Sequence, residues 1–247
     1  MVVKAVIFDF IGTLVCVRGY SLEASKMKLY KCLCDAGFDL ACDDFLVAYT
    51  QAHEKYRVVR YRRFVEVTNA VWIADALCRL GFSVDSEDER IKAAVNVFFE
   101  DYLRSLRVRR CARKILSRLS RSGYKLGLVS NFTYAPLIYA ALRQLGLEGF
   151  FDVVLVSADV GWRKPHGNIF QEALKRLGVS ASEAIYVGDS PDEDIRGAKK
   201  AGMLTIHVAS QFFPQSALRK SRHRPDYAAR SLCDAGRMLF RLLELSE

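Results

Sequence analysis

Residues 2–14 have the sequence VVKAVIFDFIGTL, and this stretch decides the fold. Its first part, from Val2 to Phe8, is apolar and rich in β-branched residues, as is typical of strands that a parallel sheet buries on both faces. The apolar run stops abruptly at Asp9. We therefore expect a buried parallel strand whose carboxyl end carries a carboxylate.

Working outward from this strand, similar apolar runs recur along the chain with helical patterns between them. This regular alternation predicts an α/β fold with a doubly wound, parallel, five-stranded Rossmann-like sheet. The other strands are expected at residues 125–129, 153–156, 184–187 and 204–208, and the helices at 111–121, 134–145, 168–177, 192–201 and 231–245.

The alternation is interrupted between residues 16 and 108, where amphipathic helices follow one another directly. We expect them at about 22–36, 43–60, 62–80 and 87–105. The sequence thus predicts a core of residues 1–15 and 109–247 with an inserted α-helical cap domain, residues 16–108. Because ligands of open α/β sheets bind at the carboxyl ends of the strands, an insert that follows the first strand directly would cover the site.

The composition of the 247 residues, with 51% hydrophobic and 26% charged, excludes disordered and low-complexity classes. The longest run without charge, 126–142, falls short of the roughly 18 apolar residues that a membrane span requires. The first residues do not have the pattern of a secretory signal. We therefore expect a cytoplasmic protein without a membrane partner.

The net charge of +9 raises the question of a polyanionic partner. The cap has equal numbers of basic and acidic residues, so the surplus lies in residues 109–247, and 109–125 alone has seven basic residues and no acidic one. Zinc-ligand spacings, helix-turn-helix patterns and RNA-binding motifs are lacking. We expect a small anionic substrate, no specific nucleic acid partner, and a monomer or homodimer.

Seven cysteines are spread through the chain, and they form no CxxC pair. We expect them to be buried thiols. Intracellular disulfides do occur in hyperthermophiles, so a disulfide remains an alternative.

Chemically capable residues follow the expected strands where each one ends. Asp9 follows the first strand, Ser130 and Asn131 the second and Asp189 the fourth, and Lys164 lies in the loop after the third. The carboxyl ends of parallel strands meet at one edge of the sheet. We therefore expect these side chains to converge there.

Four segments resemble the motifs of the haloacid dehalogenase superfamily. They occur in the order of the motifs, with the helical insert in the place of the superfamily's small helical cap. The first follows the apolar strand, and the four are Asp9-Phe10-Ile11-Gly12-Thr13-Leu14, Val129-Ser130-Asn131, Arg163-Lys164-Pro165 and Gly188-Asp189-Ser190-Pro191-Asp192-Glu193-Asp194.

The resemblance implies covalent catalysis in which Asp9 attacks phosphorus and forms an aspartyl-phosphate intermediate. Because two anions repel, the reaction needs positive charge, which Lys164 and a divalent cation would supply. Ser130 would hold the phosphoryl oxygens. Thr13 and Asn131 are expected to bind substrate beside it.

The resemblance also implies a magnesium site, because Mg²⁺ binds oxygen ligands and takes one or two carboxylates. Asp9, the backbone carbonyl of Ile11 and Asp189 would be direct ligands. Asp194 would act through water or by orienting Lys164.

Ile11 departs from the pattern of the superfamily's phosphatases, which normally carry a second aspartate at this position to protonate the leaving group. General acid catalysis is typically worth a factor of about 10²–10⁴. A phenolate (pKa about 10) or a carboxylate (about 4) leaves readily without it, whereas an alkoxide does not. The acid and base could instead be His53 or Glu54 of the cap, or Asp192 or Glu193.

The function that we expect is a magnesium-dependent phosphohydrolase for a small phosphorylated metabolite, either slow, restricted to activated esters, or using a borrowed acid. One alternative is a 2-haloacid dehalogenase, which needs no metal and no proton donor. A third is cleavage of a carbon–phosphorus bond through a Schiff base on Lys26, Lys28, Lys31 or Lys55. A fourth is a non-catalytic protein that binds phosphate or metal.

The cap segment 53–63 has five basic residues between positions 55 and 63, with tyrosines among them. Its arginines could select an anionic substrate through paired contacts. The other interpretation is a solvated helix end.

Overall fold

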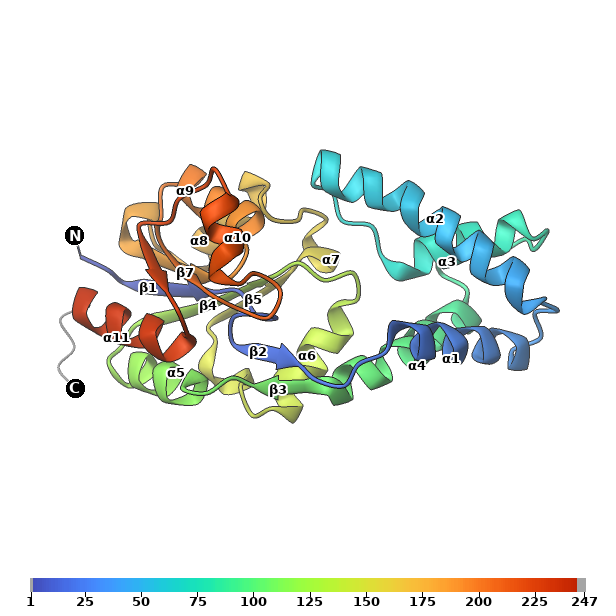
Figure 1. Ribbon diagram of the computed structural model, residues 1–247, viewed down its shortest axis with the longest axis horizontal. Helices are drawn as coiled ribbons and strands as arrows, with labels where there is room; N and C mark the ends of the chain where they lie inside the picture. Colours follow the sequence, from blue (N-terminus) through green and yellow to red (C-terminus); the bar gives the residue numbers. More distant parts are fainter. Residues whose placement is uncertain (1, 244–247) are drawn as a thin grey trace.

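The computed structural model describes residues 2–243. The chain forms two parts that lie end to end in Figure 1: a sheet covered by helices, and a group of helices that contains α1 to α4. Among the described residues, no helix is long and apolar enough to cross a membrane.

The sheet has six parallel strands in the order β5-β4-β1-β6-β7-β8. The first strand of the sequence, β1, therefore lies in the middle, and its residues are fully buried. The bounds are Ala5–Phe8 (β1), Lys125–Ser130 (β4), Val153–Val156 (β5), Ala184–Gly188 (β6), Leu204–Val208 (β7) and Tyr227–Ala229 (β8).

All five expected strands are confirmed, but the expected strand number is too low by one. The additional strand, β8, lies at the edge of the sheet beside β7. It is three residues long, and its first two residues are exposed. So short and exposed a strand lacks the continuous apolar run that identifies the buried ones.

Helices cover both faces of the sheet. Successive side chains of each strand point to opposite faces, so the apolar strands place apolar side chains on both. In β1, Val6 and Phe8 join the apolar core beneath α5, α6 and α11, while Ala5 and Ile7 join the core beneath α8. The bounds are Ala112–Arg121 (α5), Ala135–Gln144 (α6), Ser157–Val160 (α7), Gly167–Leu177 (α8), Arg196–Lys200 (α9), Gln215–Lys220 (α10) and Leu232–Leu242 (α11).

Two of the expected core helices differ in detail. The one expected at 192–201 is a π-turn over Pro191–Ile195 that continues as the short helix α9. The last one ends at Leu242, and residues 244–245 of the expected range lie outside the described residues.

The inserted segment forms the helices α1 (Leu22–Asp35), α2 (Cys42–Arg63), α3 (Asn69–Arg79) and α4 (Glu89–Ser105). The third helix does not start at 62 as expected, because α2 runs on to Arg63 and ends at Phe64, whose φ of 53° is left-handed. Residues 64–68 then form no helix, and Val65 pairs with Trp162 of the core.

The chain leaves and re-enters the core through two short antiparallel strands, β2 (Val15–Val17) and β3 (Leu106–Val108). In the register of this pair, Val17 lies opposite Leu106. The beginning and the end of the helical insert are therefore neighbours in space.

The expectation that the cysteines are buried thiols is wrong. Cys111 and Cys233 form a disulfide, with a Cα–Cα distance of 5.3 Å, between the starts of α5 and α11. Of the five free cysteines, Cys78 is exposed and the others are half-buried. The bond joins residues 122 positions apart, and only the packing of both helices on one sheet face brings them together.

Candidate active site

Three adjacent strands deliver acidic and hydroxyl side chains to the carboxyl edge of the sheet. Asp9 follows β1, Ser130 ends β4 and Asp189 follows β6, and these strands are neighbours in the sheet. Carboxylate oxygens of Asp9, Asp189 and Asp194 all lie within 4.8 Å of one another. The structure thus brings together the residues that the strand-end argument selects.

Lys164 is the buried cation of this cluster, with 1% of its surface exposed. Its Nζ donates to Asp9 Oδ1 at 2.7 Å, to the Val129 carbonyl at 2.8 Å and to the Tyr186 hydroxyl at 3.1 Å, and it lies 2.8 Å from Asp194 Oδ1. Burial opposes its charge, but the charges of Asp194 and Asp9 raise the pKa of Lys164 well above its ordinary value. The lysine is therefore a fixed positive charge beside Asp9.

Asp194 is held on both of its oxygens by the protein. Its Oδ1 accepts from the Tyr186 hydroxyl at 3.0 Å and faces Lys164, and its Oδ2 accepts the backbone N–H of Ser190 at 2.9 Å. This arrangement favours Asp194 as the residue that orients Lys164, one of the two roles expected for it.

The remaining two carboxylates are short of positive charge. Burial raises the pKa of Asp9 to about 6 even though Lys164 lowers it, and burial together with the charge of Asp9 raises the pKa of Asp189 to about 8. Thr13 Oγ1 donates to Asp9 at 2.9 Å, and Ser210 Oγ donates to Asp189 at 2.6 Å. The three clustered carboxylates offer oxygen ligands, and one ammonium does not balance their charge. This set fits a hard divalent cation such as Mg²⁺.

The absence of a side chain at Gly12 leaves room for the carboxylate of Asp189. A Cβ at position 12 would lie 2.0 Å from Asp189 Oδ2, and the φ of +101° is a conformation that residues with a side chain rarely adopt. The glycine of the first motif therefore has a steric reason for being glycine, next to the carbonyl of Ile11.

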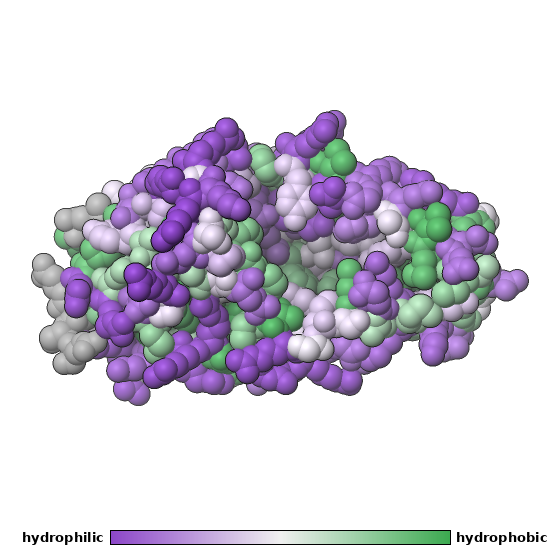
Figure 2. Space-filling view, in the orientation of Figure 1, coloured by the Kyte–Doolittle hydropathy of each residue, from purple (hydrophilic) through white to green (hydrophobic). Residues whose placement is uncertain are grey.

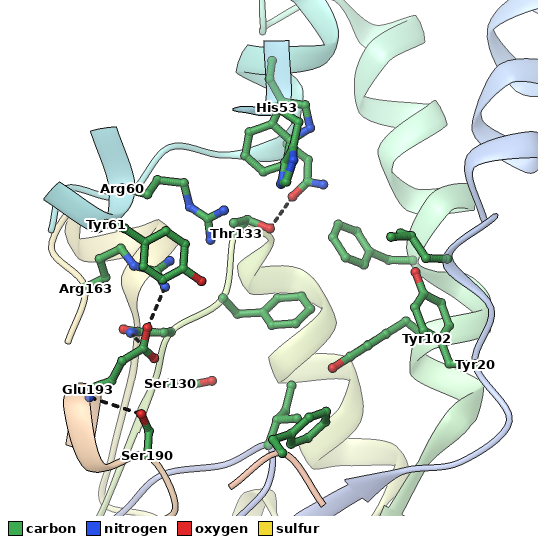
Figure 3. Close-up of a pocket in the computed structure, with 18 of the residues that line it drawn as sticks. Tyr20, His53, Arg60, Tyr61, Tyr102, Ser130, Thr133, Arg163, Ser190 and Glu193 are labelled. Carbon is green, nitrogen blue, oxygen red and sulfur yellow. Dashed lines mark hydrogen bonds and ion pairs between the residues drawn. The ribbon is translucent and has the colours of Figure 1, made fainter. Parts of the chain in front are cut away.

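The two other residues expected to bind substrate have mainly internal contacts. Thr13 is fully buried beneath Asp9 and does not line the cavity. Asn131 accepts the Lys164 backbone N–H at 2.8 Å and donates to the Lys164 carbonyl at 3.0 Å and to Glu193 at 2.9 Å. Asn131 nevertheless lines the cavity, as does Ser130, whose hydroxyl points into it in Figure 3.

A cavity of about 640 Å³ lies between this edge of the sheet and the four helices of the insert. The surface is hollowed between the two parts of the molecule in Figure 2. Figure 3 shows Tyr20 and Tyr102 on the side opposite Arg60 and Arg163, with Ser130 between them. The helical insert therefore provides much of the wall of the cavity that contains Asp9 and Asp189.

Ile11 lines this cavity and packs against the apolar core, so the usual position of the proton donor is apolar. Neither Asp192 nor Glu193, the two candidates from the fourth motif, is placed to replace it. The side chain of Asp192 is 74% exposed and faces outward to His223, and Glu193 is bound by Asn131 at 2.9 Å and Arg163 at 3.2 Å.

The two candidate acids of the cap also line the cavity, but their surroundings do not favour proton donation. Burial and the charge of Arg60 lower the pKa of His53, so its imidazole is neutral at neutral pH. Glu54 is half-exposed and accepts a hydrogen bond from Arg57 at 2.7 Å. None of the four residues considered from the sequence is therefore well placed to substitute for the missing aspartate.

An ion-pair network that the sequence does not reveal joins the insert to the core. Glu66, 1% exposed, accepts from Arg60 at 2.7 Å, from Arg163 at 2.8 Å and from Ser157 at 2.5 Å. Arg163 continues the network to Glu193, next to which it is drawn in Figure 3. The residue before Lys164 is therefore held partly by the helical insert.

The basic cap segment divides between the two interpretations. Arg60 lines the cavity, 11% exposed, and Tyr61 lines it as well, whereas Arg62 and Arg63 are exposed as in a solvated helix end. Of the four lysines considered for a Schiff base, Lys26 is the one found among the lining residues of the cavity.

Sequence analysis missed Tyr186, Ser210 and Glu66. Ser210 had a signal, because it comes two residues after the end of the strand at Val208 and the strand-end argument applies to it too. Tyr186 is a single hydroxyl within an apolar strand, and Glu66 is an isolated acidic residue of the insert. The sequence around them does not indicate that they contact the residues described above.

A buried aspartate beside a fixed lysine, at the carboxyl edge of a parallel sheet and beneath helices inserted after its first strand, is the arrangement that the sequence leads us to expect of a haloacid dehalogenase-like hydrolase. The chain matches haloacid dehalogenase-like hydrolases over residues 3–202, and it belongs to this family. Within the family it is a hydrolase of the phosphatase type.

The chain is similar to phosphatases over most of its length. The glyceraldehyde 3-phosphate phosphatase of Methanopyrus kandleri is 31% identical over 91% of this chain and 92% of its own length, and that of Methanothermobacter thermautotrophicus is 31% identical over 84% and 86%. The 2-haloacid dehalogenase of Pseudomonas syringae pv. Tomato has a similar structure, with a TM-score of 0.66, 25% identity and coverage of 97% and 99%.

Proposed function

We propose that the protein is a magnesium-dependent phosphohydrolase that acts through an aspartyl-phosphate intermediate on a small phosphorylated metabolite. The observation that carries this proposal is the buried Asp9, held by Lys164 beside the electrostatically unbalanced Asp189 at the bottom of a cavity. The two similar proteins from Methanopyrus kandleri and Methanothermobacter thermautotrophicus are glyceraldehyde 3-phosphate phosphatases, which supports a phosphorylated metabolite as substrate.

In the first step, the Asp9 carboxylate attacks phosphorus. Lys164, 2.7 Å from Asp9, attracts the phosphoryl oxygens and offsets the repulsion between the two anions, while the Ser130 hydroxyl orients them. A magnesium ion held by Asp9, Asp189 and the carbonyl of Ile11 would add positive charge at the same place. Asp194 keeps the lysine in position through its 2.8 Å ion pair.

In the second step, water hydrolyses the aspartyl phosphate and restores Asp9. Acyl phosphates have a good leaving group, because a carboxylate needs no proton to depart. Residues 16–108 would serve as the cap that limits the entry of bulk water during both steps. Residues 1–15 and 109–247 would form the catalytic core.

The second candidate function is that of a 2-haloacid dehalogenase, which Ile11 and the similarity to the Pseudomonas syringae structure favour. Halide departs without a proton, so an apolar residue at position 11 would not slow this reaction. Against it, three buried carboxylates within 4.8 Å are balanced by one lysine, which is a poor arrangement for a reaction that involves no cation.

The test measures release of phosphate from acetyl phosphate and p-nitrophenyl phosphate, with 5 mM or so of magnesium and with chelator, for the wild type and Asp9→Asn. We expect turnover that requires the metal and is lost in the variant. Ser182→Ala, on an exposed turn, is the matched control. Chloride release from 2-chloropropionate without metal would instead establish the dehalogenase, and tight phosphate binding without turnover the non-catalytic protein.

A further inference from the structure

The wall of the cavity is unusually aromatic. Ten of its 27 lining residues are Phe, Tyr or Trp, against 11% in the whole chain. Three phenylalanines, Phe98, Phe99 and Phe132, offer no hydrogen-bonding group at all. A volume of about 640 Å³ also exceeds what a three-carbon phosphate fills, since pockets of about 300–1,000 Å³ enclose drug-sized ligands.

The aromatic rings form a continuous surface that begins next to the phosphoryl site. Phe132 comes two residues after Ser130, and its ring centroid lies 5.3 Å from that of Phe99 and 5.6 Å from that of Tyr102. Tyr102 meets Tyr20 edge to face at 4.8 Å. A substrate whose phosphoryl group lies at Ser130 therefore places the rest of its body against these rings.

The apolar position that replaces the proton donor lines the same cavity. Ile11, Phe99, Phe132 and Tyr102 are all among the residues that line it. At this place the leaving oxygen must depart without help from a carboxyl group. Two independent features, the shape of the cavity and the lack of an acid, thus restrict the leaving group.

We infer that the substrate of this enzyme is the phosphate monoester of a phenol, whose flat ring lies against Phe132, Phe99 and Tyr102. The inference rests on the proposed function and names its substrate class. Aromatic rings favour edge-to-face and offset contacts with other rings. Placed against these three rings, a triose phosphate would bury its hydroxyl and carbonyl groups against carbon, at the cost of their hydrogen bonds with water. The polar side chains of the cavity, such as Arg60 and Thr133, lie on its other side.

The reaction balances without a protein acid. Asp9 forms a bond to phosphorus, the bond between phosphorus and the aryl oxygen breaks, and the electron pair stays on the phenolate, whose pKa of about 10 makes it a tolerable leaving group. The phenolate then takes a proton from the solvent. Water attacks the aspartyl phosphate, the carboxylate of Asp9 leaves with the electron pair, and phosphate is released with one proton.

The test compares kcat/KM for phenyl phosphate, acetyl phosphate and D-glyceraldehyde 3-phosphate, measured as phosphate release by the full-length protein with magnesium. We expect phenyl phosphate to exceed glyceraldehyde 3-phosphate by at least about tenfold, within the factor of about 10²–10⁴ that a missing general acid costs a poor leaving group. Equal or better turnover of glyceraldehyde 3-phosphate would overturn the inference but leave the proposed function intact. Lack of turnover of acetyl phosphate would overturn both.

A variant tests the aromatic surface itself. Phe132→Leu keeps an apolar side chain and removes the ring, so we expect the ratio of kcat/KM for phenyl phosphate to that for acetyl phosphate to fall about twofold to tenfold. Tyr227→Leu, at an exposed position on the edge strand β8, is the matched control and keeps the wild-type ratio. A ratio that is the same in Phe132→Leu as in the control would contradict the placement of the ring.

Discussion

Ile11 is two residues beyond the proposed nucleophile Asp9, at the position where a carboxyl group would protonate the leaving oxygen. Its side chain lines the cavity and packs against apolar residues, so it offers no proton donor at this position. In the proposed mechanism, the missing carboxyl group would protonate the leaving oxygen in the first step and activate water in the second. A proton is needed most where the leaving group is an alkoxide, so we expect the effect of Ile11 to depend on the leaving group.

Replacing this residue tests that dependence. Ile11→Asp supplies a proton donor, and we expect it to raise kcat/KM for glycerol 3-phosphate by about 10²-fold, with a smaller effect on acetyl phosphate. Ile11→Asn is the matched control, because an amide of the same size and polarity cannot transfer the proton. The interpretation is wrong if both variants gain equally, or if neither does while both remain folded.

Asp9 and Asp189 make the stability of the metal-free protein dependent on pH. Their folded-state pKa values of about 6 and about 8 lie above the ordinary carboxyl value, so their contribution to stability is complete below about pH 4 and is lost as the pH rises through 6 and 8. We expect the free energy of unfolding in chelator, measured with urea, to decrease over this range more steeply in the wild type than in Asp189→Asn. Magnesium should reduce the slope, because it binds the ionised carboxylates. Identical slopes for the wild type and the variant would contradict this expectation.

At the scale of elements, the loop after α2 connects the insert to the core at a third place, besides β2 and β3. The backbone N–H of Glu66 donates to the Gly161 carbonyl at 2.8 Å, and that of Arg163 donates to the Phe64 carbonyl at 2.9 Å. The Glu66 carboxylate adds ion pairs with Arg60 and Arg163. The loop that precedes Lys164 is thus held from the cap side.

Removing the charge of Glu66 leaves two buried arginines short of a partner. We expect Glu66→Gln to lower the free energy of unfolding by about 3 kcal/mol, as is usual when one partner of a buried ion pair is lost. Its kcat/KM should fall as well, since Arg163 positions the neighbouring lysine. Glu172→Gln, which breaks an exposed ion pair with Arg176 on α8, serves as control and should change stability by less than about 0.5 kcal/mol.

The elements show where sequence reasoning succeeds. Strands buried on both faces are continuous apolar runs. The sequence therefore predicts β1, β4, β5, β6 and β7, together with the acidic and hydroxyl residues at their ends. The edge strand β8 cannot, because Tyr227 and the residue after it are exposed. The break at Phe64 depends on a pairing with the core at Trp162, and contacts so distant in sequence leave no local pattern. The contacts of Tyr186 and Glu66 escape prediction for the same reason.

At the scale of the whole molecule, one covalent bond connects the two ends of the core's second segment. Cys111 and Cys233 enclose most of the core, and cross-linking so long a loop restricts the unfolded chain strongly. We expect reduction with dithiothreitol, or Cys233→Ser, to lower the free energy of unfolding by about 2–4 kcal/mol. Cys78→Ser, at an exposed free cysteine, is the control. Equal urea midpoints for the oxidised and reduced protein would show that the bond contributes nothing.

The pairing of Val17 with Leu106 determines how the helical insert could be deleted from the chain. Because the insert leaves and returns at adjacent positions, a two-residue turn of the kind that joins hairpin strands is enough to close β2 onto β3. Excising the helices between them would leave a single continuous chain, but it would also remove Glu66 from its ion pair with Arg163 and the apolar contacts that the insert makes with the core. The insert can therefore be bypassed along the chain, yet Arg163, the neighbour of Lys164, would lose its buried partner.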